Sequence, residues 1–309
     1  MKNNHRFVPA VATALALFGG ASAQAQNSAR NDQPNIVVHL PNPYAPAGPF
    51  DAHPGGFAGA AGGGGKMSYH GGPVMGGTPN AYVIWYGGWT DAQKQIIRDF
   101  LNGIGGSPYF NINKTYSISG TPVTGLVNFS GEVVSTYAGG TALTDQSIQN
   151  IVAAAGPTDL NGVYFVLTGT DITKDGFCTS YCGWHTYANL GAGNIKYSFV
   201  GNPSACPLVG VSVGACAGQT AKSPNGDVGV DAMVSVLAHE LEEAVTDPEL
   251  NAWFDLFGYE NADKCAWKFG TTPTDPVSGA YYNVSWSNRK FLVQMNWLNV
   301  KSGSCAIKY

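Results

Sequence analysis

The chain has 309 residues, of which only 12% are charged, and its formal net charge at pH 7 is −4. Lysine and arginine form no basic patch, which argues against nucleic acid as a partner. Beyond the N-terminal region, no segment has the roughly 18 uninterrupted apolar residues of a membrane span, so none is expected.

Residues 1–25 have the pattern of a secretory signal peptide. Lys2 and Arg6 precede an apolar run, and small residues then allow cleavage after Ala23 or Ala25. The mature protein is therefore expected to be soluble and secreted, with an oxidising periplasm as the alternative destination.

Residues 26–66 are rich in proline and glycine and contain no cysteine. Such a segment buries too little apolar surface to offset the entropy of ordering it. It is expected to be a flexible leader or a pro-segment, followed by one folded domain over 67–309.

Apolar periodicity in this domain predicts alternating strands and helices. The strand 194–201 alternates in the manner of an edge strand, and Pro248 ends the last helix. The pattern indicates an α+β fold with a mixed sheet packed on helices and a disulfide-tied C-terminal part. The expected strands are 80–86, 126–137, 162–169 and 194–201, and the expected helices are 90–104 with Thr90 or Asp91 as N-cap, 144–155 with Thr144 as N-cap, and 228–246.

All six cysteines lie in the exported part, where disulfides are the expected chemistry. A zinc site made by the first two cysteines and His185 is the alternative. Six cysteines allow about 15 connectivities, and the sequence alone does not choose among them. Closeness along the chain favours the pairs Cys178–Cys182, Cys206–Cys216 and Cys265–Cys305.

The last helix contains the stretch AHELEEAVTDPE over 238–249, which resembles the H-E-x-x-H motif of zinc hydrolases. Glu243 stands in the place of the second histidine. His239 and Glu243 are one turn apart, on the side opposite an apolar stripe, so they are expected to face a cleft. Glu240 flanks them, where the catalytic base beside a metal-bound water would lie. The stripe consists of Val230, Val234, Leu237, Leu241 and Ala244.

An acidic helix face is usually just solvated, which is the simpler interpretation of this stretch. The chain has six glutamates, however, and five of them lie within residues 240–260. Glutamate that is rare elsewhere is thus concentrated beside one histidine, and this favours a metal site.

A third ligand has to come from downstream of the helix. Glu260 is the preferred candidate, with Asp263 as a partner that supports it, and Glu249 is the alternative. Asp247 and Asp255 are weaker candidates, and Asp247 before proline is expected to be a helix-end turn residue.

Zinc is the expected ion, with calcium or no ion as alternatives. Each carboxylate ligand donates negative charge and makes the ion a weaker Lewis acid than it would be with imidazole ligands. Outside the helix, His185 is expected to pack beside Trp184, with a hydrogen bond to a substrate as the alternative.

Four long stretches of the chain have a recognisable sequence: YHGGPVMGGTPNAYVIWYGGWTDAQKQIIRDF, VLTGTDITKDGFCTSYCGWHT, FVGNPSACP and NGDVGVDAMVSVLAHELEEAVTDP. With these stretches the chain resembles a known family, the phosphate-induced, EXORDIUM-like secreted proteins. The resemblance runs from His70 to Cys305 and implies an extracellular, often cell-wall-associated protein without an assigned biochemical activity. In plants the family is linked to growth and brassinosteroid responses, and it supplies no catalytic residues.

The order of elements is also similar to that of a zincin catalytic domain, in which an edge strand, here 194–201, binds an extended peptide substrate. The sequence therefore predicts a secreted, monomeric zinc peptidase, with the ion on His239, Glu243 and Glu260. Glu240 would move the proton from the bound water. The alternatives are a non-catalytic extracellular protein with a structural metal or none, and carbohydrate hydrolysis by paired carboxylates.

Overall fold

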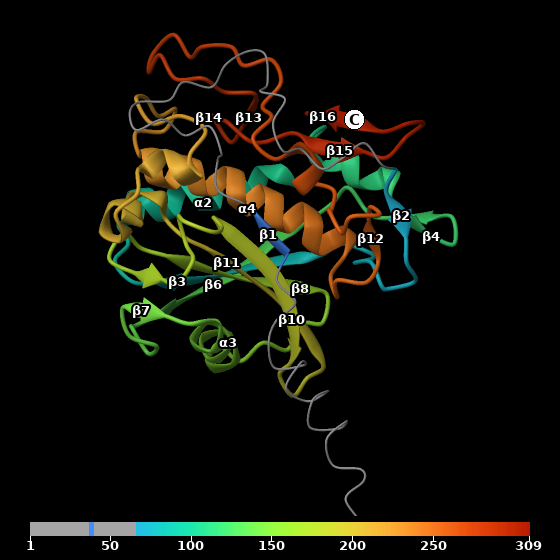
Figure 1. Cartoon of the computed structure of the whole chain (residues 1–309), viewed down its shortest axis with the longest axis horizontal. Coiled ribbons are helices and arrows are strands. Elements are labelled where there is room, and N and C mark those ends of the chain that lie inside the picture. Colours follow the sequence, from blue (N-terminus) through green and yellow to red (C-terminus); the bar gives the residue numbers. More distant parts are fainter. Residues whose placement is uncertain (1–36, 40–65) are drawn as a thin grey trace, which may run out of the picture. The chain divides into compact units, whose positions relative to one another are not determined.

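The computed structural model describes residues 37–39 and 66–309, and the predicted signal peptide and most of the predicted leader lie outside them. The fold is α+β, as predicted. Its main sheet has six strands in the order β1-β10-β11-β8-β3-β6 (Figure 1). β10 is antiparallel to β1 and β11, and the other neighbours are parallel, so the sheet is mixed. The strands are β1 Val37–His39, β10 Gly183–Asn189, β11 Asn194–Val200, β8 Gly162–Thr168, β3 Asn80–Tyr86 and β6 Asn128–Ser135.

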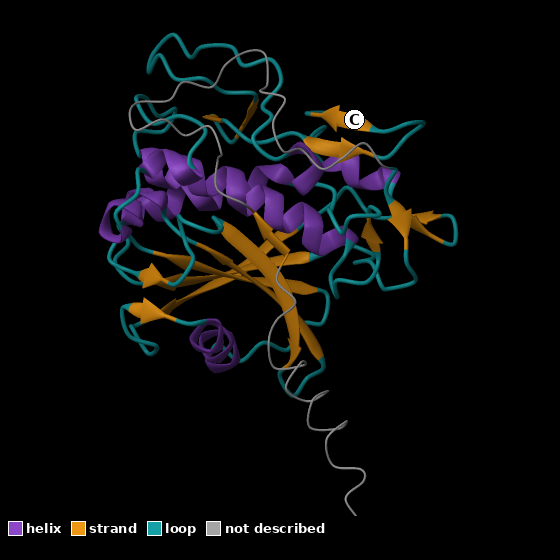
Figure 2. Cartoon of the chain, in the orientation of Figure 1, coloured by secondary structure: helices purple, strands orange, loops and turns teal. Residues whose placement is uncertain are grey.

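Helices cover both faces of this sheet (Figure 2). α2 (Asp91–Ile104) and α4 (Val228–Thr246) lie on one face, and α3 (Asp145–Ala154) lies on the other. Thr90 and Thr144 cap α2 and α3, as predicted, by accepting hydrogen bonds from backbone N–H groups in the first turn. The central strand β8 is buried along its whole length because helices cover both of its sides. Within the described residues, no helix is long and apolar enough to cross a membrane.

Short strand pairs and 3₁₀ turns complete the fold, and the C-terminal pairs pack on the outer side of α2 and α4 (Figure 1). The strand pairs are β2 (Ser68–Tyr69) with β12 (Trp253–Phe254), β4 (Ser117–Ile118) with β5 (Thr121–Pro122), β7 (Ala142–Leu143) with β9 (Thr173–Lys174), β13 (Val284–Trp286) with β14 (Arg289–Phe291), and β15 (Asn296–Leu298) with β16 (Ser304–Ala306). The turns are η1 (Phe110–Thr115), η2 (Pro203–Val209), η3 (Val213–Cys216) and η4 (Asp263–Cys265).

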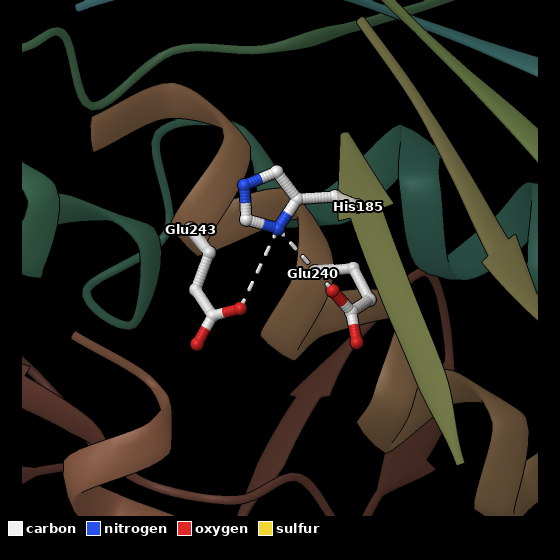
Figure 3. A group of neighbouring side chains, drawn as sticks. All are labelled: His185, Glu240 and Glu243. Carbon is white, nitrogen blue, oxygen red and sulfur yellow. Dashed lines mark ion pairs between the residues drawn. The ribbon is translucent and has the colours of Figure 1, made fainter. Parts of the chain in front are cut away.

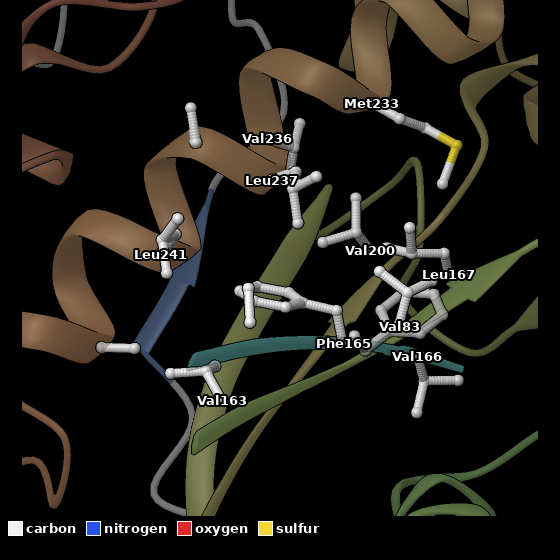
Figure 4. Packing of buried hydrophobic residues seen from close by; sticks show 14 of the residues in the cluster. Val83, Val163, Phe165, Val166, Leu167, Val200, Met233, Val236, Leu237 and Leu241 are labelled. Atoms are coloured by element: carbon white, nitrogen blue, oxygen red, sulfur yellow. The ribbon is translucent and has the colours of Figure 1, made fainter. Parts of the chain in front are cut away.

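α4 has the predicted bounds, and every residue in it from Gly229 to Thr246 is buried. Its predicted apolar stripe faces the sheet, where Leu237 and Leu241 pack against Phe165 of β8 (Figure 4). Each of these large side chains stabilises the fold by about 1.5–3 kcal/mol.

The predicted cleft on the opposite side of α4 is wrong, because C-terminal chain covers that side. The small side chain of Ser235 allows the close approach: its Oγ accepts a hydrogen bond of 3.1 Å from the backbone N–H of Gln294. Further along the helix, the Asn261 amide donates to the carbonyl of Glu242 at 3.1 Å. The polar side of α4 therefore faces protein.

The predicted edge strand is also wrong. Residues 194–200 form β11, which lies between β8 and β10, so the strand beside β1 is β10. A tight turn over 190–193, in which Gly191 and Gly193 have positive φ angles of 93° and 134°, folds β10 back on β11. The sequence of β10 includes glycine, histidine, threonine and asparagine. It therefore lacks the alternation of apolar and polar residues that predicts a strand.

Two of the three predicted disulfides are wrong. The structure pairs Cys178 with Cys206 and Cys182 with Cys216, with Cα atoms 5.5 and 5.4 Å apart. Segment 178–182 packs against η2 and η3, so each of its cysteines meets a partner from there rather than its neighbour in sequence. The predicted Cys265–Cys305 bond is present. Three disulfides agree with the predicted export to an oxidising compartment.

The Cys265–Cys305 bond joins two cysteines that are 40 residues apart in the sequence, and so closes a long loop. We expect the double variant Cys265→Ser and Cys305→Ser to lose about 3–4 kcal/mol of unfolding free energy, because the unfolded chain regains the entropy of the open loop. Urea denaturation of the two proteins measures this difference. A loss below about 1 kcal/mol would show that the bond contributes little to stability.

Candidate functional site

The H-E-x-x-E stretch of α4 brings His239 and Glu243 together, as their spacing predicts. His239 Nε2 lies 2.9 Å from Glu243 Oε1, one helical turn away. Both side chains are buried, with 1% and 0% of their surface exposed. The predicted pair thus forms inside the protein.

His185 joins this pair from β10, and its predicted role as a packing residue is wrong. Its Nδ1 lies 3.4 Å from Glu240 Oε2 and 3.6 Å from Glu243 Oε2 (Figure 3). Side chains alternate across a strand, so His185 shares its face of β10 with Gly183. Recognition of residues 183–189 as a strand next to α4 would have placed His185 in the site.

Gly183 sets how closely β10 approaches the helix. A Cβ atom at this position would lie 2.6 Å from Val236 Cγ1 and 3.0 Å from Glu240 Oε1. A glycine is therefore needed here for the strand to bring His185 within reach of Glu240 and Glu243.

The segment that follows β12 contributes two more carboxylates. Asp263 Oδ1 lies 3.5 Å from His239 Nε2, and the Asp263 N–H donates a hydrogen bond of 3.1 Å to Glu243 Oε1. Glu260 Oε1 lies 3.7 Å from His185 Nε2, and the Glu260 N–H donates to Asp263 Oδ2. Asp263 is therefore the carboxylate next to His239, and Glu260 lies against the other imidazole.

The remaining sequence candidates have other surroundings. Glu249 is half-buried, and its carboxylate is close enough to Lys196 to interact with that side chain electrostatically. Asp247 is the predicted helix-end residue, since its Oδ1 accepts hydrogen bonds of 2.6 Å from two backbone N–H groups of the following turn. Asp255 pairs with Lys264 at 2.7 Å.

Two groups of three side chains could each hold a metal ion, because within each group the ligand atoms lie within 4.8 Å of one another. One group is His239, Glu243 and Asp263, and the other is His185, Glu240 and Glu243. We call these the first group and the second group. Both contain Glu243. Glu260 belongs to neither, although it is buried beside His185.

Comparison with known proteins bears on the identity of the chain. Residues 67–308 match the family described as phosphate-induced protein 1 conserved region. The chain belongs to this family. The match confirms the resemblance expected from the sequence.

Named relatives in the family come from plants. Protein EXORDIUM-like 3 of Arabidopsis thaliana is 35% identical over 77% of this chain and 82% of its own length, and protein EXORDIUM-like 5 is 35% identical over 75% of each. Protein PHOSPHATE-INDUCED 1 of Nicotiana tabacum is 26% identical over 74% of this chain and 84% of its own. These three names refer to no reaction, ligand or metal. No solved structure matches the chain.

The electrostatics of the site in this member of the family reflect burial and mutual pairing. Burial raises the pKa of Glu240 to about 7. Burial also opposes ionisation of Glu243, but the neighbouring imidazoles outweigh it and lower the pKa of Glu243 to about 2. Burial disfavours the charged forms of His185 and His239, yet the surrounding carboxylates raise both pKa values well above the ordinary range. Positive charge is therefore stabilised at this site.

Glu242 is fully buried but lies outside both groups. Burial raises its pKa well above the ordinary value, and Asn113 is near its carboxylate. The concentration of glutamate in the sequence thus marked the right helix, although only Glu240 and Glu243 of the five belong to the two groups.

We expect the variant His185→Ala, studied in the presence of a chelator, to lose about 3–5 kcal/mol of unfolding free energy. The change leaves buried carboxylates without their positive partner. His70→Ala is the matched control, because His70 is exposed, and its loss should stay below about 1 kcal/mol. Equal losses in the two variants, measured by urea denaturation, would contradict a charged cluster around His185.

Proposed function

We propose that this protein is a non-catalytic extracellular member of the family whose α4 site binds a divalent metal ion, with zinc as the preferred ion. The observation that carries the proposal is the burial of imidazoles and carboxylates that come from three separate parts of the chain; among them Asp263 is the most exposed, at 9%. β10 contributes His185, α4 contributes its H-E-x-x-E residues, and the segment after β12 contributes Asp263. An ion held there would fasten the C-terminal part to the sheet.

The first group supplies the ligands in this proposal. His239 Nε2 is 2.9 Å from Glu243 Oε1 and 3.5 Å from Asp263 Oδ1. Bonds of about 2.0–2.2 Å to one zinc ion separate neighbouring ligand atoms by about 2.9–3.5 Å, depending on the coordination number. Asp263 therefore takes the place of Glu260, the third ligand that the sequence favoured. An imidazole nitrogen in the group favours zinc over calcium, which prefers oxygen ligands.

The burial of Glu240 supports a binding role over a catalytic one. A hydrolytic zinc site keeps one coordination position open for water and admits a substrate beside its base. The Glu240 side chain is 0% exposed and lies against His185. A peptide bond has no access to it in this arrangement.

We expect the purified mature protein to contain zinc, and His239→Ala to lose most of it, as measured by elemental analysis. The ion should also raise the unfolding free energy, by about 2.7 kcal/mol when free zinc is at 100 times its dissociation constant. Dialysis against a chelator should remove this gain.

His70→Ala serves as the matched histidine control and should keep the zinc content of the wild type. Wild-type protein that contains no metal and gains no stability from added zinc would overturn the proposed function.

One observation favours a second candidate function, a zinc peptidase that is latent in this form. β1, from the predicted leader, pairs antiparallel with β10, and Val37 lies opposite His185. An extended peptide bound by strand addition would occupy the same edge. In this candidate the leader is a pro-segment, the ion lies on His239 and Glu243, and Glu240 moves the proton of the metal-bound water.

Peptidase activity of the full mature chain tests the second candidate. The double variant Val37→Pro and Val38→Pro removes the N–H donors of β1 and weakens its pairing with β10. A latent peptidase should then cleave a peptide library, and Glu240→Gln in the same background should reduce the rate by about 100-fold or more. If the proline variant keeps its zinc but cleaves no peptide, the latent peptidase is excluded and the non-catalytic function remains.

A further inference from the structure

The two groups meet at Glu243, and they use different oxygens of its carboxylate. Oε1 faces His239 and Asp263 in the first group, whereas Oε2 faces His185 in the second. We propose that the cluster is a two-metal centre in which Glu243 bridges one divalent ion in each group. This inference rests on the proposed metal site and adds a second ion to it.

The second group has the geometry of a zinc site. His185 Nδ1 lies 3.4 Å from Glu240 Oε2 and 3.6 Å from Glu243 Oε2 (Figure 3). Tetrahedral zinc with bonds of about 2.0–2.2 Å places its ligand atoms about 3.3–3.6 Å apart. The ligand separations therefore need little adjustment to accept an ion.

The imidazole of His185 is oriented to give a lone pair to that ion. Its Nε2 lies 3.3 Å from the carbonyl oxygen of Asp247 and 3.7 Å from Glu260 Oε1. A proton on Nε2 donates to the carbonyl oxygen of Asp247 and leaves Nδ1 as an acceptor that faces Glu240 and Glu243. Metal-binding histidines are commonly held in this way by a carbonyl or carboxylate behind the ring. Glu260 thus acts behind His185, and not as a direct ligand.

An independent observation points to a ligand in the second group. Glu240 is fully buried, and neither of its oxygens has a hydrogen-bond partner among the described residues. Glu243 Oε2 and His185 Nδ1 also lack one, whereas Glu243 Oε1 accepts from the Asp263 N–H. Burying an ionised carboxylate without hydrogen bonds costs free energy, because the carboxylate loses its hydration. A bound cation offsets that loss by pairing with the negative charge. With one ion in the first group, Glu240 would have only the imidazole of His185, at 3.4 Å, as a charged partner.

The charge of the cluster agrees with two ions. Glu240, Glu243, Glu260 and Asp263 are four carboxylates, and the two imidazoles are neutral when they bind metal. Two divalent cations balance four negative charges in a site whose carboxylates are at most 9% exposed. Bridged ions of this kind lie about 3.5–4 Å apart.

The test is the number of ions per chain in the full mature protein. The protein is stripped with a chelator, saturated with zinc alone, freed of excess zinc by gel filtration and analysed for metal. We expect about two zinc ions in the wild type and about one in Glu240→Gln, which alters only the second group. Asp263→Asn, which alters only the first group, should also retain about one.

Glu242→Gln is the matched control, because Glu242 lies on the same helix, is equally buried and belongs to neither group. It should retain both ions. One ion in the wild type, unchanged in Glu240→Gln, would overturn the two-metal centre and leave the single site of the proposed function. No ion in the wild type would overturn both.

Manganese gives a second measurement, in which the wild-type spectrum alone decides whether the bridge exists. Two Mn²⁺ ions bridged by Glu243 couple magnetically, so the electron paramagnetic resonance spectrum of the saturated wild type should show an exchange-coupled pair. Glu240→Gln should show the spectrum of an isolated ion. A wild-type spectrum of isolated ions alone, at saturation, would overturn the bridge.

Discussion

The structure depends on one constraint: α4 carries ionisable side chains but has no side that faces solvent. α4 packs its apolar stripe on the sheet, and its opposite side meets C-terminal chain. Carboxylates in such a place have to be protonated, hydrogen-bonded or paired with positive charge. The folded chain meets part of this requirement with the two imidazoles and with the backbone N–H of Asp263, which donates to Glu243. Metal binding is a physical answer to the same requirement, since divalent cations balance the charge that the fold encloses.

Local signals in the sequence were sufficient to predict the three α-helices and four of the six main-sheet strands that the structure describes. The caps at Thr90 and Thr144 and the proline after α4 gave helix bounds that agree with the structure, because these signals act within one turn. The H-E-x-x-E spacing likewise placed His239 beside Glu243, since residues four apart share one side of a helix. The family resemblance was also found from the sequence and is confirmed.

The errors all concern partners that are distant along the chain. β10 was missed because five of its seven residues are small or polar, and with it the position of His185 was lost. The disulfides were paired by closeness in sequence, whereas the structure joins cysteines 28 and 34 residues apart. The side of α4 opposite the sheet was expected to be open, because periodicity describes a helix and not what is packed against it. The third ligand, predicted as Glu260 with Glu249 as the alternative and Asp263 in support, stays a prediction, because it depends on a loop whose path no periodic signal describes.

Gly183 affects which sequence pattern identifies a site of this kind. The five residues from His239 to Glu243 make an acidic helix in any protein that contains them. Here they meet His185 only because the facing strand has a glycine two residues earlier, which lets the two backbones approach closely. A search by the helical motif alone would therefore collect many ordinary helices. A pattern that joins Gly-x-His on a strand to His-Glu-x-x-Glu on a helix describes the site itself.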